Sequence, residues 1–237
     1  MTTTLKIVSA ETPIAVFSKL SDALCLEARR AVQERNAFFC ALSGGTTPEP
    51  LYKDLARRPD FPWQKTQVFI VDERCVPEDD PRSNFGMLQE ALVATGALQR
   101  EQLHCVNATL PKAAAQYERL LRERLPDGRL DAILLGMGSD GHTASLFPNS
   151  VGLNAADRWV VANEGPTVVP PARITMTAPF INTARWVGAL VVGESKRAML
   201  RKIFTGTIAA SDAPIRLIAP ESGLAYYIDA PADPRPC

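Results

Sequence analysis

A glycine-rich segment, Gly136–Pro148 (GMGSDGHTASLFP), directly follows the apolar run Leu130–Leu135. It contains His142, one of only two histidines in the chain. An imidazole titrates near pH ~6.5, so it can accept and return a proton at neutral pH. If Thr143 begins a helical turn, the helix dipole would keep the ring neutral and able to act as a base. The other histidine, His104, lies in an apolar run and is predicted to be structural.

The same segment formally matches the glycine pattern of dinucleotide-binding turns, with Gly136, Gly138 and Gly141 at the required spacing. That pattern needs a helix that continues from the third glycine, but Pro148 arrives within seven residues. A dinucleotide site also has no use for an acid such as Asp140 inside the turn. We therefore expect no nucleotide cofactor at this segment.

A second polar loop, Ser43–Pro50 (SGGTTPEP), lies between a predicted strand and a predicted helix. Gly44 and Gly45 allow a tight turn, and the start of the helix offers free N–H groups with a partial positive charge. The serine and the threonines add hydroxyl groups. These features favour a phosphate cradle, although a plain strand-to-helix turn capped by Thr47 fits the same residues. The loop is not a Walker A loop, because no Gly-Lys-Ser/Thr follows it.

Charged residues gather in a third segment, Val71–Met87, after another predicted strand. Asp72, Glu73 and Arg74 leave the end of that strand. Carboxylates and an arginine at this position can bind a polyol or polarise a carbonyl group, and a solvated charged loop is the plain alternative. Cys75 beside them is expected to be a small buried filler, because no histidine partner lies nearby in the sequence.

Two further cations fit an anion site. Arg173 lies in PPARITMT, which reads as a short strand without an acidic neighbour, and Lys196 begins a predicted helix. Each fits a solvated surface charge equally well when taken alone. Both lie at element ends on the side where a ligand is expected.

Apolar runs alternate with helical patterns along the whole chain, which predicts βαβ units and a mostly parallel sheet covered on both faces. The expected strands are 38–42, 68–71, 103–106, 130–135, 186–192 and 225–228, and the expected helices are 18–35, 48–55, 84–93, 112–125 and 195–204. In such sheets ligands bind beyond the carboxyl ends of the strands. The three polar loops above all follow strands, so we expect them to meet at one site.

Composition places the chain among ordinary globular proteins, with 237 residues, 46% hydrophobic and 22% charged. The 26 basic and 26 acidic residues cancel, so no global field attracts nucleic acid or a membrane surface. No apolar stretch approaches the ~20 residues of a membrane helix, and no signal peptide is evident. We expect one domain over residues 1–237, with a loose tail from about residue 231. The five scattered cysteines indicate reduced thiols and a cytoplasmic protein.

Taken together and in this order, the three loops resemble those of the 6-phosphogluconolactonase family. The matching segments are SGGTTP (43–48), VDERCVPEDDPRSN (71–84) and GMGSDGHTASLFP (136–148), with PARITMT (171–177) and GESK (193–196) as secondary matches. The resemblance implies a three-layer α/β/α sandwich and hydrolysis of 6-phosphogluconolactone in the pentose phosphate pathway. It implies that the phosphate is held by Ser43, Gly44, Gly45, Thr46, Arg173 and Lys196. It also implies that Asp72 and Arg74 face the sugar and that His142 is the catalytic base, with Asp140 beside it.

Hydrolysis of a lactone needs a base for water, a group for the developing oxyanion and rigid positioning. Arg74, or backbone N–H groups of the loop Gly136–Gly141, would stabilise the oxyanion, and the sequence leaves this choice open. No ligand spacing for a metal is evident and no cofactor is needed. We expect a small sugar phosphate as the partner of a monomer or small homo-oligomer.

Two alternatives share this fold. A glucosamine-6-phosphate deaminase would carry a carboxylate further along the same turn, as in DGHxAFNEP, where this chain has Phe147. A non-catalytic sugar-phosphate sensor would need neither His142 nor Asp140, and the chain retains both.

Overall fold

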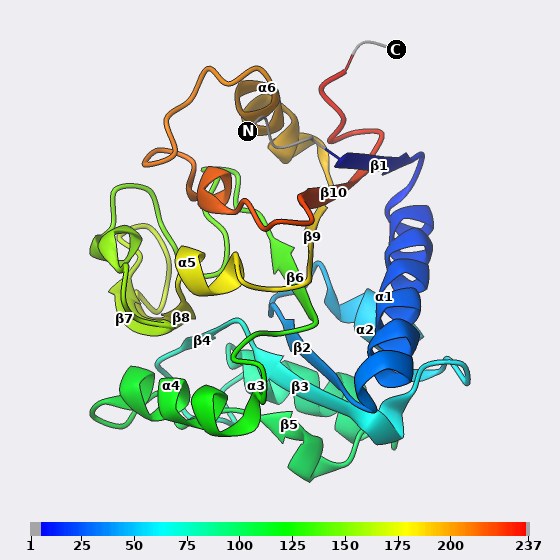
Figure 1. Cartoon of the computed structure of the whole chain (residues 1–237). Coiled ribbons are helices and arrows are strands. Elements are labelled where there is room, and N and C mark those ends of the chain that lie inside the picture. The colour runs from blue at the N-terminus through cyan, green and yellow to red at the C-terminus, as the bar shows by residue number, and fades with distance from the viewer. Residues whose placement is uncertain (1–5, 236–237) are drawn as a thin grey trace.

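The computed structural model describes residues 6–235. Its main element is a seven-stranded sheet of order β1-β10-β9-β6-β2-β3-β5, in which every neighbouring pair is parallel (Figure 1). Its strands are β1 (Lys6–Ala10), β2 (Phe38–Leu42), β3 (Thr66–Ile70), β5 (Leu103–His104), β6 (Ala132–Gly136), β9 (Trp186–Val191) and β10 (Leu224–Asp229). A smaller antiparallel sheet of order β4-β8-β7 consists of β4 (Asp72–Arg74), β8 (Ala172–Met176) and β7 (Val160–Glu164).

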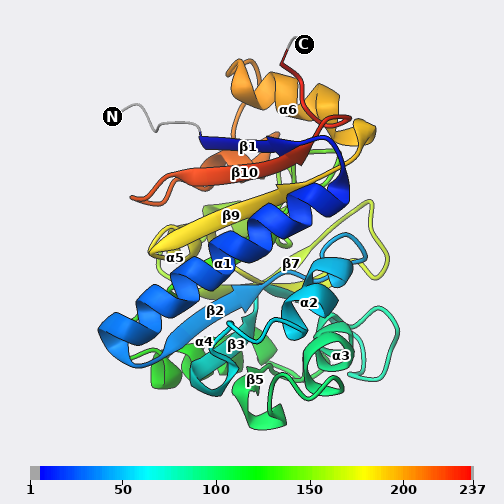
Figure 2. The same cartoon turned by 90° about the vertical axis from the view of Figure 1, so that its right-hand side faces the viewer.

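Helices cover both faces of the main sheet. They are α1 (Pro13–Arg35), α2 (Glu49–Ala56), α3 (Asn84–Leu88), α4 (Ala113–Arg124), α5 (Ala178–Ile181) and α6 (Arg197–Phe204). The long helix α1 crosses the strands on one face (Figure 2), and the small sheet lies on the opposite side of the main sheet (Figure 1).

Strand alternation divides the interior into two cores. Ala132 and Leu134 of β6 belong to the core that contains α1, α2 and α3. The intervening Ile133 and Leu135 belong to the core that contains α4, α5, α6 and parts of the small sheet. The result is the three-layer α/β/α arrangement with a parallel sheet that the sequence predicts.

Most predicted elements are present with small differences at their ends, but α1 begins earlier than expected. The sequence pattern suggests Ser18 as its cap. In the structure Thr12 caps the helix, accepting a hydrogen bond from the Ala15 N–H at 3.3 Å, and Pro13 occupies the first turn. The predicted helix 84–93 consists of α3 followed by a π-helical turn at Gln89–Val93.

Three strands were not predicted: β1, β4 and β7. The triplet Asp72–Arg74 is fully charged and therefore looks like a solvated loop, because β propensity reflects packing on a half-buried surface. In the structure it pairs antiparallel with β8, and Arg74 stands opposite Arg173. This pairing brings two of the predicted loops and the PARITMT strand together.

The segment from about residue 231, predicted as a loose tail, makes contacts with the rest of the chain as far as the structure describes it. Ala232 is fully buried, and the Arg197 side chain donates hydrogen bonds to the carbonyl groups of Ala230 and Pro231 at 2.9 and 2.8 Å. Arg235 donates to Ser9 Oγ at 2.9 Å, so the chain is held against the sheet edge up to that point. Among residues 6–235, no helix combines the length and the apolar content that crossing a membrane requires.

Candidate active site

A cavity of about 430 Å³ lies where β2, β6 and β9 end, and β4 and β8 of the small sheet close one side of it. Nine of the ten predicted site residues line it: Ser43, Gly44, Gly45, Thr46, Asp72, Arg74, His142, Arg173 and Lys196. The tenth, Asp140, is bonded to His142. Residues of all three post-strand loops therefore lie around one cavity.

His142 is paired with Asp140. Its Nδ1 lies 2.6 Å from Asp140 Oδ1, and its backbone N–H donates to the same oxygen at 3.1 Å. Partial burial opposes ionisation of Asp140, but the hydrogen bond and charge of His142 outweigh it and lower the carboxyl pKa. A carboxylate accepts only, so Nδ1 carries the proton and Nε2 is left with its lone pair.

The imidazole is fixed by its neighbours and not by a helix. Thr143 begins no helical turn; it forms a bridge with Leu146, and its hydroxyl donates to the Gly136 carbonyl at 2.7 Å. The expected dipole effect on His142 is therefore wrong, and Asp140 sets the tautomer instead. Phe147 covers the ring at a centroid distance of 5.0 Å.

Gly138 is required by the same pair. A Cβ atom at this position would lie 2.2 Å from His142 Nδ1 and 2.4 Å from Asp140 Oδ1. The Gly138 N–H also donates to the His142 carbonyl at 2.8 Å, which closes the turn. The absence of a side chain here is what lets the acid and the base meet.

Two guanidinium groups stand side by side on the small sheet. Arg74 and Arg173 are directly opposite in register, and neither makes an ion pair with a carboxylate among residues 6–235. Arg173 is only 6% exposed, so it is not the solvated surface charge that the sequence allows. Burial, followed by the charge of Arg74, lowers the pKa of Arg173. An anionic ligand would relieve both effects.

Lys196 approaches the cavity from the 3₁₀ turn Glu194–Lys196 that precedes α6. Burial lowers the pKa of its ammonium group, and the charge of Asp140 opposes that effect. The glycine loop faces it from β2. Gly45 has a φ of +98°, which favours glycine, and α2 begins at Glu49 after Pro48, with no hydrogen bond from a capping side chain. The expected alternative, a turn capped by Thr47, is therefore not what the structure contains.

The two acids of β4 have different environments. Asp72 lines the cavity, and its Oδ2 accepts a hydrogen bond from Ser145 Oγ at 2.6 Å. Glu73 points into the protein and accepts from the backbone N–H groups of Asn84 and Phe85 at 2.8 and 2.7 Å. Burial raises the pKa of Glu73 despite these bonds. Glu73 thus anchors the start of α3, whereas Asp72 faces the ligand space.

Three buried polar atoms at this cavity have no hydrogen-bond partner among residues 6–235: Ser43 Oγ, Arg74 Nε and Asn84 Oδ1. Buried polar groups nearly always have a hydrogen-bond partner, so a cluster of atoms without one indicates a position where a ligand or water binds. Asn84 Nδ2 donates to the Asp72 carbonyl at 2.6 Å, which fixes its amide orientation. Its Oδ1 lies against Gly44, where a Cβ would come within 1.8 Å.

Sequence reasoning missed the supporting residues. Asn84 and Ser145 lie inside the matched segments but carry no charge, and neither shows a spacing that marks it as functional. Glu73 resembles its two neighbours in β4 until the alternation of the strand is known. Once β4 is recognised as a strand, alternation places Asp72 and Arg74 on one face and Glu73 on the other.

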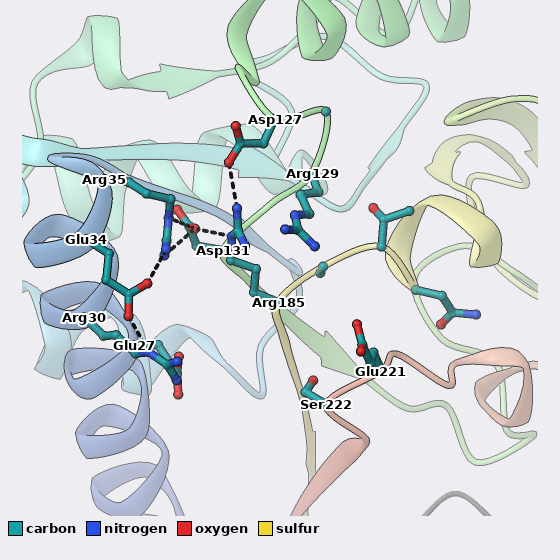
Figure 3. Close-up of a pocket in the computed structure, with 14 residues that line it drawn as sticks. Glu27, Arg30, Glu34, Arg35, Asp127, Arg129, Asp131, Arg185, Glu221 and Ser222 are labelled. Carbon is teal, nitrogen blue, oxygen red and sulfur yellow. Dashed lines mark hydrogen bonds and ion pairs between the residues drawn. The ribbon is translucent and has the colours of Figure 1, made fainter. Parts of the chain in front are cut away.

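A larger hollow of about 1040 Å³ lies at the opposite, amino-terminal end of the strands. Its charges are largely paired (Figure 3): Arg35 and Arg185 converge on Asp131 at 3.0 and 3.3 Å, and Arg185 also reaches Asp127 at 2.6 Å. No histidine is among the residues that line it. The predicted site residues line the smaller cavity instead, and the ion pairs of this hollow join elements at the other end of the sheet.

Within residues 6–235, no three side chains of histidine, cysteine, aspartate or glutamate gather as metal ligands would. The four cysteines in that range, Cys25, Cys40, Cys75 and Cys105, are free thiols. Cys75 is half-buried beside the apolar core, which fits a packing role. His104 is buried against Phe69 and far from the cavity lining.

Comparison with known proteins extends these observations. A family model described as "Glucosamine-6-phosphate isomerases/6-phosphogluconolactonase" matches residues 11–227. A protein of Nostoc sp. named 6-phosphogluconolactonase is 37% identical over 228 residues, covering 92% of each chain. A rice protein named probable 6-phosphogluconolactonase 3, chloroplastic, is 36% identical, covering 85% of this chain and 67% of that protein.

The solved structures include close matches to the fold. The 6-phosphogluconolactonase of Thermotoga maritima superimposes with a TM-score of 0.84 at 28% identity, covering 95% of this chain and 100% of that one. The match therefore extends over nearly the whole chain.

Proposed function

The chain belongs to the family of glucosamine-6-phosphate isomerases and 6-phosphogluconolactonases, and we propose that it is a 6-phosphogluconolactonase. It hydrolyses 6-phospho-D-glucono-1,5-lactone to 6-phospho-D-gluconate, a step of the oxidative pentose phosphate pathway. The family implies a sugar-phosphate substrate. The observation that carries the proposal is the His142–Asp140 pair beside two guanidinium groups without carboxylate partners.

In this reaction His142 is the general base. Its Nε2 removes a proton from a water molecule as the water oxygen attacks the lactone carbonyl carbon. The tetrahedral intermediate collapses by breaking the bond to the ring oxygen, and the imidazolium returns the proton to that oxygen. Asp140 holds the ring in the required tautomer and stabilises the transient imidazolium charge.

Arg74 is the better candidate for stabilising the oxyanion. The loop Gly136–Gly141 was the alternative, but several of its N–H groups are already engaged. Those of Gly138 and Gly141 donate to backbone carbonyls, and the neighbouring His142 N–H donates to Asp140. Arg74 lines the cavity with an unpartnered Nε. Preorganised donors of this kind act strongly where water is excluded.

The phosphate is held by the glycine loop Ser43–Thr46 together with Arg173 and Lys196. Loop N–H groups and two partly desolvated cations suit a dianion. The bound phosphate offsets the unfavourable free energy of burying the two cations. Asp72 accepts hydrogen bonds from sugar hydroxyl groups. Anchoring the distant phosphate aligns the carbonyl carbon with the water.

The deaminase reaction of the same family is less well supported. Phe147 occupies the place where deaminases carry a carboxylate, and it is buried against the imidazole. A group without a titratable proton cannot assist ring opening of an amino sugar.

The direct test is proton release after freshly generated 6-phosphogluconolactone is added to the protein, compared with the spontaneous rate. Acceleration by several orders of magnitude is expected. A rate equal to the uncatalysed one, with 6-phosphogluconate still bound, would instead identify a sugar-phosphate sensor.

We further propose that one domain carries this activity, because β1 near the start of the chain pairs with β10 near its end. A monomer or small homo-oligomer suffices, since one chain supplies every residue of the site. The activity requires neither a metal nor a cofactor, and neither nucleic acid nor a membrane is a partner. Free thiols at both buried and half-buried positions fit a reducing compartment such as the cytoplasm.

A further inference from the structure

We propose that Ser145 is a positioning residue that holds the Asp72 carboxylate in its substrate-facing orientation. The inference rests on the proposed function, in which Asp72 contacts the sugar. It concerns a residue three positions beyond His142, on the same turn as the base. Ser145 therefore links the proposed base to the acid on the other side of the cavity.

The contact between the two residues is short and shielded from water. Ser145 Oγ donates to Asp72 Oδ2 at 2.6 Å, and the two residues are only 1% and 7% exposed. This is the one side-chain hydrogen bond made to the Asp72 carboxylate among residues 6–235. Hydrogen bonds to an ionised group are stronger than neutral ones, and low exposure strengthens them further.

Ser145 is itself fixed from two sides by the small sheet. Its backbone N–H donates to Thr175 Oγ1 of β8 at 3.1 Å. Its carbonyl accepts from Asn163 Nδ2 of β7 at 2.8 Å. Thr175 stands opposite Asp72 in the β4–β8 ladder, so the serine and the carboxylate it holds are positioned by the same strand.

The need for such a restraint follows from the charges nearby. Arg173 lies close enough for its charge to interact with that of Asp72, yet the two make no ion pair within 4.0 Å. A carboxylate free to rotate would move toward a guanidinium group and neutralise part of the proposed phosphate site. The bond from Ser145 keeps one carboxylate oxygen occupied. Oδ1 accepts no hydrogen bond from the part of the chain that the structure describes, so it is available for a sugar hydroxyl.

A double-mutant cycle tests this role. Ser145→Ala is expected to lower kcat/KM for the lactone roughly 10- to 100-fold, the range for losing a hydrogen bond to a charged group. In the Asp72→Ala background the same substitution should lower kcat/KM by less than about twofold, because the carboxylate that Ser145 holds is absent. Ser150→Ala is the matched control, since Ser150 Oγ accepts from Asn163 in the same network but does not touch Asp72. Ser150→Ala should lower kcat/KM by less than about threefold.

An equal loss from Ser145→Ala in both backgrounds would overturn the inference, as would a loss of the same size in Ser150→Ala. Absence of lactonase turnover in the wild-type protein would overturn the proposed function alone. Urea unfolding of the same four proteins then still measures coupling between Ser145 and Asp72. Non-additive unfolding free energies would support the inference, and additive ones would overturn it.

Discussion

At the scale of single residues, the site depends on which groups are left without a partner. Asp140 occupies one imidazole nitrogen of His142 and thereby frees the other. Arg74 and Arg173 are paired in register; each donates to a backbone carbonyl, and neither makes an ion pair with a carboxylate among residues 6–235. If every polar group of the site had a hydrogen-bond partner in the protein, the fold would be more stable, but no group would remain to bind a substrate. We therefore expect the groups without a partner to be the ones that contact the ligand.

Replacing His142 by alanine should lower kcat at least ~10²-fold, because a positioned base contributes roughly 10²–10⁴-fold in rate. Binding of 6-phosphogluconate should persist, since the base acts on water and not on the phosphate anchor. Stopped-flow proton release and calorimetric titration of the product measure the two effects. Near-normal turnover in the variant would remove His142 from the mechanism.

Gly138→Ala should lower kcat by a comparable factor although it removes no functional group. Its Cβ would overlap both His142 Nδ1 and Asp140 Oδ1, so the pair must separate. Gly136→Ala is the comparison, because a Cβ there meets no heavy atom within 4 Å. Its kcat should stay within about fivefold of wild type. Equal losses in the two variants would show that the loop tolerates no side chain at all, independent of the pair.

Site residues can be predicted from the sequence where an infrequent titratable or charged residue stands in an unusual local context. His142 stands out as one of two histidines in a glycine-rich turn after a strand, and Arg173 as a cation in an apolar strand. Asn84 and Ser145 could not be predicted in the same way. Their roles depend on which backbone group or carboxylate lies opposite, and that is set by tertiary contacts.

At the scale of elements, the two ends of the main sheet have separate tasks. The carboxyl ends carry the cavity, while the amino ends carry the network around Asp131 (Figure 3). Asp131 lies just before β6 and accepts from Arg35 at the end of α1, from Arg185 before β9 and from the Phe39 N–H of β2. One carboxylate thus joins four elements far from the chemistry.

Asp131→Ala should lower the free energy of unfolding by about 2–4 kcal/mol, because the half-buried Phe39 N–H loses its acceptor and two arginines lose their shared partner. Asp127→Ala, which removes a carboxylate that is 54% exposed, should cost less than about 1 kcal/mol. Urea denaturation measures both. Lactonase kcat/KM at 25 °C should be unchanged in each variant, and a large loss in Asp131→Ala would show that the two ends are coupled.

The short strand β5 should make stability depend on pH through His104. Burial, aided by Arg124 and Arg100, lowers the pKa of this histidine from 6.5 to about 4. Between these values the unfolded chain binds more protons than the folded one, so stability is lost as the pH falls from 6.5 to 4. His104→Gln should remove about 2–3 kcal/mol of that loss. Urea unfolding at pH 7 and pH 4 checks it, and parallel curves for variant and wild type would contradict the assignment.

Elements were predictable where their pattern is strong. The buried strands β2, β6 and β9 are apolar runs between loops and helices, and their identity follows directly from the sequence. The triplet of β4 could not be recognised, since its stability comes from pairing with β8, a segment about a hundred residues later in the chain. The helical turn expected at Thr143 is absent for a similar reason. The Thr143 hydroxyl donates to the carbonyl of Gly136, seven residues earlier, and this contact cannot be read from the local sequence.

At the scale of the whole molecule, positive and negative charges balance, so selectivity for a substrate must come from the residues around the cavity. The formal net charge is zero, so we expect an anionic substrate to be attracted by the few cations that line the cavity at one end of the sheet. The same scaffold serves a family with two reactions. We propose that the side chain that covers the imidazole, Phe147 here, decides between them.

The choice of reaction and the absence of a metal requirement can be decided in one experiment on chelator-treated enzyme. The two histidines lie far apart in the sequence and the thiols are scattered, so the three-ligand site of zinc catalysis is not expected. Lactonase activity should therefore survive exhaustive chelation within about twofold. Glucosamine-6-phosphate should bind through its phosphate yet release no ammonia, because Phe147 cannot relay a proton. Ammonia release at a rate comparable to lactone hydrolysis would favour the deaminase, and activity that is lost on chelation and restored by zinc would reveal a metal site.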